Sequence, residues 1–205
     1  MRNILLIAGP VTDPRRFMAE LGCHPDIAAL PPVTLGNTLH AVARRAVSAA
    51  SAGDRSGDAL LTLAREEGGA ALASYFTTLR ASTGKSAIVL HDPSGPMFPF
   101  LNPPDIDLLV LTRDAESAAR TVGAGAITRV VEAARKALES FERRVTGFGV
   151  GAERIHTVDE DELRRDPRAL WPEICRRIGV DDGVAAVDAM ARPSVTPWSL
   201  RSGRF

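Results

Sequence analysis

The fold is decided by residues 3–17, which read "NILLIAGPVTDPRRF". Residues 4–8 form an unbroken apolar run, which is typical of a strand that is covered on both faces of a sheet. The run ends at Gly9, and a short helical pattern follows over residues 15–21. A strand, a turn and a helix in this order build a loop that can bind phosphate at the helix N-terminus. The pair Asp13-Pro14 also fits an ordinary helix start, because Asp caps helices and Pro suits the first helical position.

Further strands and helices alternate along the chain. Three more apolar runs predict strands at residues 87–90, 108–111 and 154–158, and the last and weakest of them fits an edge strand. Helical periodicity extends over residues 35–50, 58–80, 126–144 and 168–178. This alternation predicts an α/β fold, with a mainly parallel central sheet of about four to five strands between helical layers, a three-layer α/β/α arrangement. We expect residues 1–205 to form a single domain, with an irregular tail over residues 191–205.

The composition is that of a globular chain of 205 residues, with 45% hydrophobic and 24% charged residues. Its 25 basic and 25 acidic side chains cancel, which argues against a broad nucleic-acid-binding surface. No apolar run approaches the ~20 residues of a membrane span, and the first run is too short for a secretory signal. The two cysteines, Cys23 and Cys175, make no disulfide framework, so a reducing cytoplasmic location is the simplest expectation.

Two side chains follow predicted strands directly, at the edge where open α/β sheets bind ligands. His91 can act there as a general base near neutral pH, or it can only bond to a neighbouring loop. Arg113 can hold a phosphate with its planar guanidinium, or it can pair on the surface with Asp114, Glu116 or Asp161. The remaining histidines show no metal-ligand spacing, so we expect no metal site.

Four segments carry a family resemblance when they are taken in order. They are "LLIAGPVTDPRRFMAELGCHPDIAAL" (5–30), "VLHDPSG" (89–95), "LLVLTRDAESAARTV" (108–122) and "VDEDELRRDPRALWPEICRRIGV" (158–180). The first is similar to an opening strand with its 5′-phosphosulfate loop, the second to a strand end that carries Lys or His, and the third to a 3′-phosphate segment. The last is the longest match and is largely structural. Together they resemble the sulfotransferases that use 3′-phosphoadenosine 5′-phosphosulfate (PAPS).

The resemblance implies a P-loop NTPase-like fold and a reaction. PAPS would donate a sulfuryl group to a hydroxyl or amine of a small molecule or glycan and leave 3′-phosphoadenosine 5′-phosphate (PAP), without a metal. His91 would be the catalytic residue, as a base or as a group that steadies the sulfuryl group. The implied cofactor-binding residues are Gly9, Thr12, Arg15, Arg16, Arg113, Thr121 and, in the tail, Arg201. The sequence itself leaves the oligomeric state open, with a homo-oligomer as one alternative.

The loop departs from the family pattern where the sulfate would bind. Residues 12–16 read "TDPRR", whereas the family has a loop close to R-S-G-T-T. Pro14 replaces the glycine and has no N–H. Asp13 replaces the serine, and its charge repels a sulfate unless Arg15 and Arg16 neutralise it.

Three interpretations therefore stay open. The chain is an active PAPS-dependent sulfotransferase, a catalytically inactive protein of the same fold that serves in binding or assembly, or a small P-loop-like nucleotide kinase. Against the kinase, no Walker A lysine follows the first predicted strand. Residues 83–86, "TGKS", carry the ending of a Walker A loop, but they precede a strand instead of following one.

Overall fold

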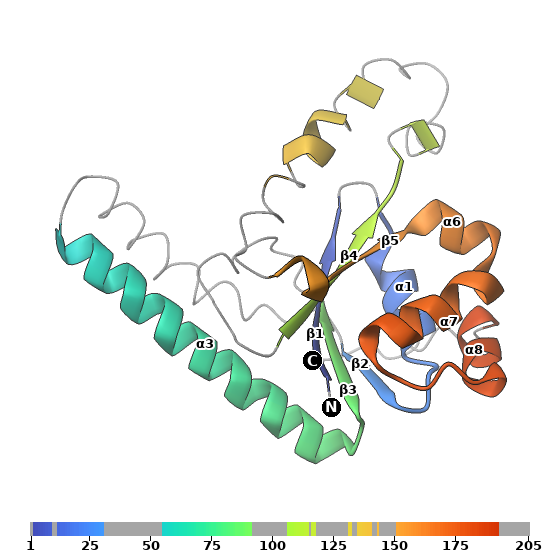
Figure 1. Cartoon of the computed structure of the whole chain (residues 1–205), viewed down its shortest axis with the longest axis horizontal. Helices are drawn as coiled ribbons and strands as arrows, with labels where there is room; N and C mark the ends of the chain where they lie inside the picture. Colours follow the sequence, from blue (N-terminus) through green and yellow to red (C-terminus); the bar gives the residue numbers. More distant parts are fainter. Residues whose placement is uncertain are drawn as a thin grey trace, which may run out of the picture.

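The centre of the molecule is a five-stranded parallel sheet in the order β2-β3-β1-β4-β5 (Figure 1). The computed structural model describes residues 2–9, 12–30, 55–91, 106–114, 116–117, 131–132, 135–140, 143 and 151–192. The strands are β1 (Arg2–Ala8), β2 (Ile27–Leu30), β3 (Ala87–His91), β4 (Ile106–Thr112) and β5 (Ile155–Asp159). The predicted α/β class is confirmed, and the weak run at residues 154–158 is the edge strand β5.

The central strand is buried on both faces of the sheet. Successive side chains of a strand point in opposite directions. Ile4 and Leu6 of β1 accordingly belong to one hydrophobic cluster, and Leu5 and Ile7 belong to a second one. All four side chains are at most 3% exposed. Burial on both faces explains the unbroken apolar run and confirms the three-layer arrangement.

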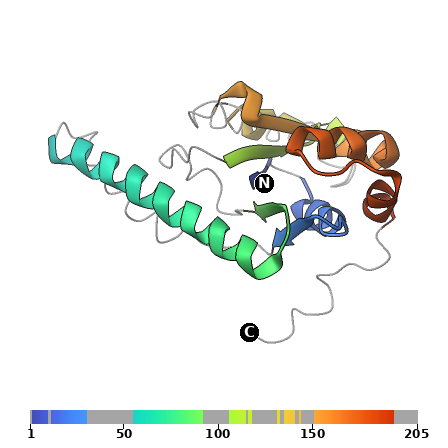
Figure 2. The same cartoon turned by 60° about the horizontal axis from the view of Figure 1, so that its bottom comes forward.

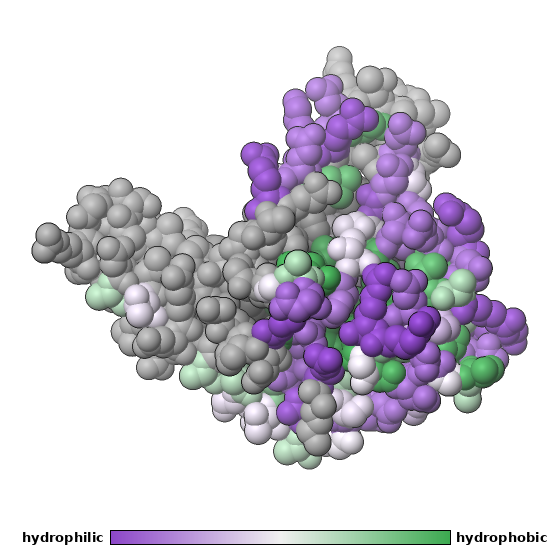
Figure 3. All heavy atoms as spheres, viewed as in Figure 1, coloured by the Kyte–Doolittle hydropathy of each residue, from purple (hydrophilic) through white to green (hydrophobic). Residues whose placement is uncertain are grey.

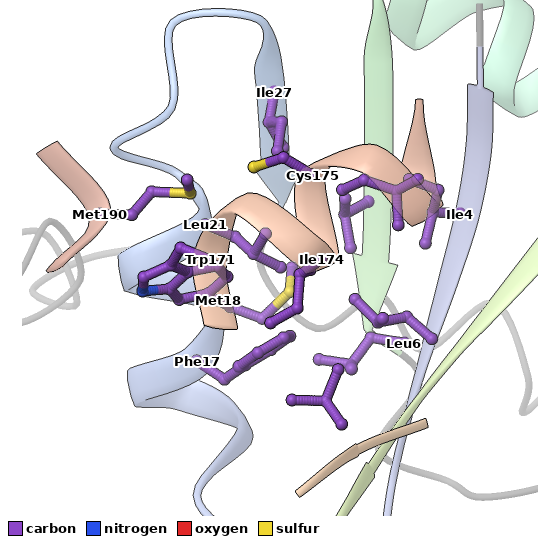
Figure 4. Packing of buried hydrophobic residues seen from close by; sticks show 14 of the residues in the cluster. Ile4, Leu6, Phe17, Met18, Leu21, Ile27, Trp171, Ile174, Cys175 and Met190 are labelled. Carbon is purple, nitrogen blue, oxygen red and sulfur yellow. The ribbon is translucent and has the colours of Figure 1, made fainter. Parts of the chain in front are cut away.

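Among the described residues, four helices cover the first face: α1 (Pro14–Leu21), α6 (Glu160–Arg165), α7 (Pro167–Ile178) and α8 (Val184–Ala191). Phe17 of α1 stacks on Trp171 of α7, with the ring centroids 5.5 Å apart. Figure 4 shows this pair beside Met18 and Ile174, with Ile4 and Leu6 of β1 to the right of them. Phe17 and Trp171 are at most 2% exposed. Helix α1, which begins at the candidate loop, is thereby fixed against the C-terminal helices.

The long helix α3 (Arg55–Thr83) covers the second face. Its Leu72 and Phe76 are 3% and 0% exposed and pack in the second cluster. Figures 1 and 2 show that the first turns of α3 extend beyond the sheet, whereas its last turns lie beside β3. The helix includes the predicted range 58–80.

Asp-Pro pairs start two of the described helices, α1 and α7, and the first of these starts was predicted. Asp13 and Asp166 each accept a hydrogen bond from the backbone N–H three residues further on, at 3.2 and 3.1 Å. Asp114, which follows β4, accepts from the N–H groups two and three residues further on, both at 2.9 Å. Helix α7 ends at Gly179, whose φ of 71° is the left-handed conformation that glycine favours.

Strand β2 was missed in the sequence because its four residues, "IAAL", form too short and too weak an apolar run. The turn before it is fixed by His24, which is 1% exposed. The His24 Nδ1 accepts a hydrogen bond from the N–H of Asp26 at 3.0 Å. In that tautomer the His24 Nε2 donates to the carbonyl oxygen of Asp181, 2.7 Å away. A contact over 157 residues of sequence therefore sets the start of β2.

Two short helices were also missed, and some predictions lie outside the described residues. Helix α6 has only six residues, and α8 reads "VAAVDAMA", which has little amphipathic contrast. The predicted helix over residues 35–50 and residues 193–205 of the predicted tail lie outside the described part of the chain. The predicted helix over residues 126–144 is described only in part, and the described residues are helical.

The described surface over α6, α7 and α8 is mostly hydrophilic, with small separate hydrophobic spots (Figure 3). Within the described ranges, no helix combines the length and apolar character needed to cross a bilayer. Cys23 and Cys175 are both free thiols. Burial raises the pKa of the Cys175 thiol to about 12, so this thiol stays protonated at neutral pH.

His156 of β5 should make the stability depend on pH. Burial lowers the pKa of His156 below 6.5; Asp107 opposes this effect, and Arg177 and Arg2 add to it. The unfolded chain therefore binds this proton more tightly than the folded chain. We expect the contribution of His156 to be fully present above pH 6.5 and to be lost as the pH falls through the folded pKa.

Urea unfolding at about pH 7.5 and about pH 5.5 measures this dependence across the range in which histidine titrates. The His156→Gln variant should lose less free energy of unfolding than the wild type between the two conditions, because it lacks the titrating group. Both proteins keep the other three histidines, so the difference isolates His156. Equal losses in the two proteins would contradict the prediction.

Candidate functional site

Three adjacent strands bring the predicted site residues to one edge of the sheet. β1 lies between β3 and β4, so the segments that follow these strands are neighbours. Gly9 continues the β1 ladder by donating its N–H to the carbonyl oxygen of Leu111 at 2.7 Å. His91 pairs with Leu6, so it lies three residues, or roughly 10 Å, deeper along the strand direction than Gly9. Gly9, His91 and Arg113 thus all follow or end strands at the carboxyl edge.

The loop between β1 and α1 bonds to its own side chains. The Thr12 hydroxyl donates to the carbonyl oxygen of Gly9 at 2.7 Å. Asp13 takes up the backbone N–H of Arg16 as the helix cap. Pro14 contributes no N–H. The first turn of α1 therefore offers fewer backbone donors to a ligand than an ordinary helix start.

The backbone N–H of Asp13 is also engaged, by a residue from the far end of the chain. It donates to Oε2 of Glu160, the first residue of α6, at 3.1 Å. The other carboxylate oxygen of Glu160 accepts from Arg164 at 2.6 Å. The Glu160 side chain is only 4% exposed, whereas that of Arg164 is 32% exposed. A buried carboxylate thus connects the loop to the segment that follows β5.

Arg113 is held by Asp161, which follows Glu160 on helix α6. Its Nε donates to Oδ1 of Asp161 at 3.1 Å, and the two side chains are 11% and 20% exposed. This is one of the three pairings that the sequence left open for Arg113. The second carboxylate oxygen of Asp161 is buried without a hydrogen-bond partner. Glu160 and Asp161 together contact both the loop and the arginine of the predicted site.

Arg16 contacts an acid one turn along its own helix. Its Nε donates to Oε1 of Glu20 at 2.7 Å, away from the loop. This hydrogen bond is the main reason that the pKa of Arg16 is raised, and the charges of Glu20, Glu160 and Asp13 add to it. Arg15 is exposed. Each of the two arginines that were expected to neutralise a sulfate is therefore solvent-facing or paired with a carboxylate.

His91 is the last residue of β3 and is 6% exposed. By strand alternation it shares a face with Ala87 and Val89, which pack under α1 and α7. Its ring is therefore a buried group on the same side of the sheet as α1. Thr121 and Arg201 lie outside the described residues.

The segment that resembles a Walker A ending lies at the other edge of the sheet. Gly84 follows α3 with a φ of 64°, and β3 begins three residues later. The ammonium group of Lys85 bonds to the carbonyl oxygen of Pro25. This position, before a strand, confirms that the segment is a helix-to-strand turn.

The described residues fit an anionic nucleotide better at one end of the site than at the other. Arg113 is a largely buried guanidinium at a strand end, which suits a phosphate group. In the loop, the N–H groups of Asp13 and Arg16 are taken by carboxylates, and Pro14 has none. An anionic nucleotide such as PAPS would meet a suitable cation at Arg113 but a loop whose N–H groups are already bonded to carboxylates.

Glu160 is the residue of this site that the sequence did not reveal. Its contact with Asp13 spans 147 residues, and no local pattern distinguishes it in "VDEDELRRDP" from the other acids. Asp161, in contrast, is one of the three partners that the sequence predicts for Arg113.

No family model and no curated protein sequence matches the chain. Solved structures do match its fold. The sulfotransferase domain of the Synechococcus PCC 7002 olefin synthase superposes with a TM-score of 0.58 at 18% identity, over 91% of this chain and 75% of that one. The sulfotransferase from Alicyclobacillus acidocaldarius gives 0.53 at 15% identity, over 89% and 82%. A mouse sulfotransferase complexed with PAP gives 0.52 at 13% identity, over 95% and 65%.

At these low identities the superpositions show the fold alone, and they agree with the parallel sheet and its flanking helices. The chain is a divergent member of the sulfotransferase fold.

Proposed function

We propose that this protein is a sulfotransferase that transfers a sulfuryl group from PAPS to a hydroxyl or amine of a small molecule or glycan. The observation that carries the proposal is the placement of His91 and Arg113 at the ends of the two strands that flank β1. The complex of the mouse neighbour with PAP supports a nucleotide of this class as the ligand.

Within this proposal, each residue has a defined task. Arg113 binds the 3′-phosphate, with Thr121 beside it, while Gly9, Thr12, Arg15 and Arg16 line the 5′ end and Arg201 reaches in from the tail. PAPS, when bound, supplies an activated sulfuryl group. A ring nitrogen of His91 takes the proton from the attacking acceptor atom, because a neutral imidazole is basic enough at neutral pH. The burial of His91 keeps this proton transfer away from bulk water.

A second candidate is a sulfotransferase-fold protein that binds without catalysing transfer. The observation that favours it is the loop, in which the carboxylates of Asp13 and Glu160 take two backbone N–H groups and Pro14 removes a third. Such a protein would serve in binding or assembly, and its strand-end residues would be structural.

Consumption of PAPS in the presence of a panel of phenols, alcohols, amines and sugars separates the two candidates. The first predicts stoichiometric release of PAP and formation of a sulfated product with at least one acceptor class. Binding of PAP with no turnover across the whole panel favours the second. Binding of neither nucleotide excludes the first.

A further inference from the structure

We infer that the Glu160 carboxylate competes with a ligand anion for the β1–α1 loop, and that its charge sets the affinity of the loop for PAPS and PAP. The inference rests on the proposed function, because it concerns the 5′ end of the same site. The contact between the Asp13 N–H and Glu160 Oε2, at 3.1 Å, is the observation from which it starts.

The position of this carboxylate is well determined by its surroundings. The Glu160 side chain is 4% exposed, and both of its oxygens have partners, the Asp13 N–H and the Arg164 guanidinium. It lies on the first turn of α6, directly after β5. A buried carboxylate with two hydrogen bonds does not readily turn away into solvent. The Glu160 side chain therefore stays beside the loop when a ligand binds.

The loop N–H that Glu160 occupies belongs to the same turn that an anion would use. Backbone N–H groups at the start of a helix attract anions through their partial charge and the helix dipole. Here one such group serves a carboxylate of α6, and another, on Arg16, serves the carboxylate of Asp13. The protein itself therefore supplies the negative charge that a 5′-phosphate or phosphosulfate would otherwise bring.

Charge explains why removal of this carboxylate should strengthen binding. Arg16 lies within electrostatic range of Glu20, Glu160 and Asp13 at once, so three acids compete for one cation of the loop. At an effective dielectric constant near 20, a ligand anion about 5 Å from an isolated Glu160 charge would lose somewhat more than about 100-fold in affinity. The guanidinium of Arg164 beside this carboxylate reduces the repulsion, so a loss of about 10- to 100-fold is expected. A glutamine at this position keeps an oxygen for the Asp13 N–H and removes only the charge.

The test compares Glu160→Gln with Glu173→Gln by isothermal titration calorimetry, with PAP and with inorganic pyrophosphate as the two probes. Glu173 is a matched control, because it also pairs with an arginine four residues away on a C-terminal helix, but its side chain is 50% exposed. The expected result is that E160Q binds both probes about 10-fold or more tightly than the wild type, whereas E173Q binds them as the wild type does. If E160Q folds poorly, Glu160→Met, which has a similar length and no charge, takes its place.

The two probes separate the inference from the proposed function. Tighter pyrophosphate binding without PAP binding in any variant supports the role of Glu160 and excludes the PAPS proposal. Unchanged or weaker pyrophosphate binding in both E160Q and E160M overturns the inference, and it would mean that Glu160 holds the loop in its binding conformation. PAP binding by the wild type together with that outcome leaves the proposed function intact.

Discussion

Replacement of Arg113 by alanine should weaken PAP binding by about 10- to 100-fold. The guanidinium is expected to form charge-assisted hydrogen bonds with the 3′-phosphate, and such bonds contribute about 1.5–3 kcal/mol each. Each 1.4 kcal/mol corresponds to a tenfold change in affinity. Only 11% of the Arg113 side chain is exposed, so solvent does not replace the lost contact well. Titration calorimetry with PAP measures the effect.

The alanine variant also leaves Asp161 without its partner, so a more conservative change accompanies it. Arg113→Lys keeps a positive charge beside Asp161 but removes the planar fork that suits a phosphate. It should fold and still lose about tenfold in affinity. Arg177→Ala is the control, because Arg177 pairs with Glu173 and lies on the exposed side of α7. If Arg113→Lys and Arg113→Ala both bind PAP with wild-type affinity, Arg113 does not bind the 3′-phosphate.

Replacement of His91 should abolish most of the sulfuryl transfer while leaving nucleotide binding nearly unchanged. General-base catalysis typically contributes 10²- to 10⁴-fold to a rate, roughly. His91 ends β3, the strand next to β1, and is on the same face as α1. We therefore expect kcat of His91→Gln to fall by about 10²-fold or more, with a Kd for PAP within about threefold of the wild type.

The pH profile gives this variant a second readout. In the wild type, kcat/KM should rise as the catalytic imidazole loses its proton, and this limb should disappear in His91→Gln. His156→Gln is the control, because it removes a histidine of β5 that lies outside the proposed site. A fully active His91→Gln enzyme, or a loss of turnover that is matched by a loss of PAP binding, would contradict the role of base.

Most of the fold follows from local patterns in the sequence. The runs in β1, β3 and β4 are readable because strands covered on both faces carry apolar residues at every position. The Asp-Pro pairs mark the starts of α1 and α7, because an Asp cap and a Pro at the first helical position are local features. Strand β2 has no such signal, since its ordering depends on the distant contact of His24 with Asp181.

The site was less readable than the fold, for the same physical reason. His91 and Arg113 can be found from the sequence, because His91 ends a strand, Arg113 follows one, and such positions converge at one sheet edge. The Asp13 N–H of the loop is instead bonded to the carboxylate of Glu160, which comes from a segment 147 residues away. Periodicity and motif spacing describe neighbours along the chain, so they do not reveal a charge that the fold brings to the loop.

We propose that the carboxyl edge of this sheet recognises a nucleotide by its 3′-phosphate, and a comparison of PAP with adenosine 5′-phosphate tests this recognition. The two ligands differ only in that phosphate. Titration calorimetry with the wild-type chain should give a Kd for PAP at least about tenfold lower than that for adenosine 5′-phosphate, with no binding of ATP plus Mg²⁺. Equal affinity for PAP and adenosine 5′-phosphate, or preferential binding of ATP with Mg²⁺, would contradict 3′-phosphate recognition at this edge.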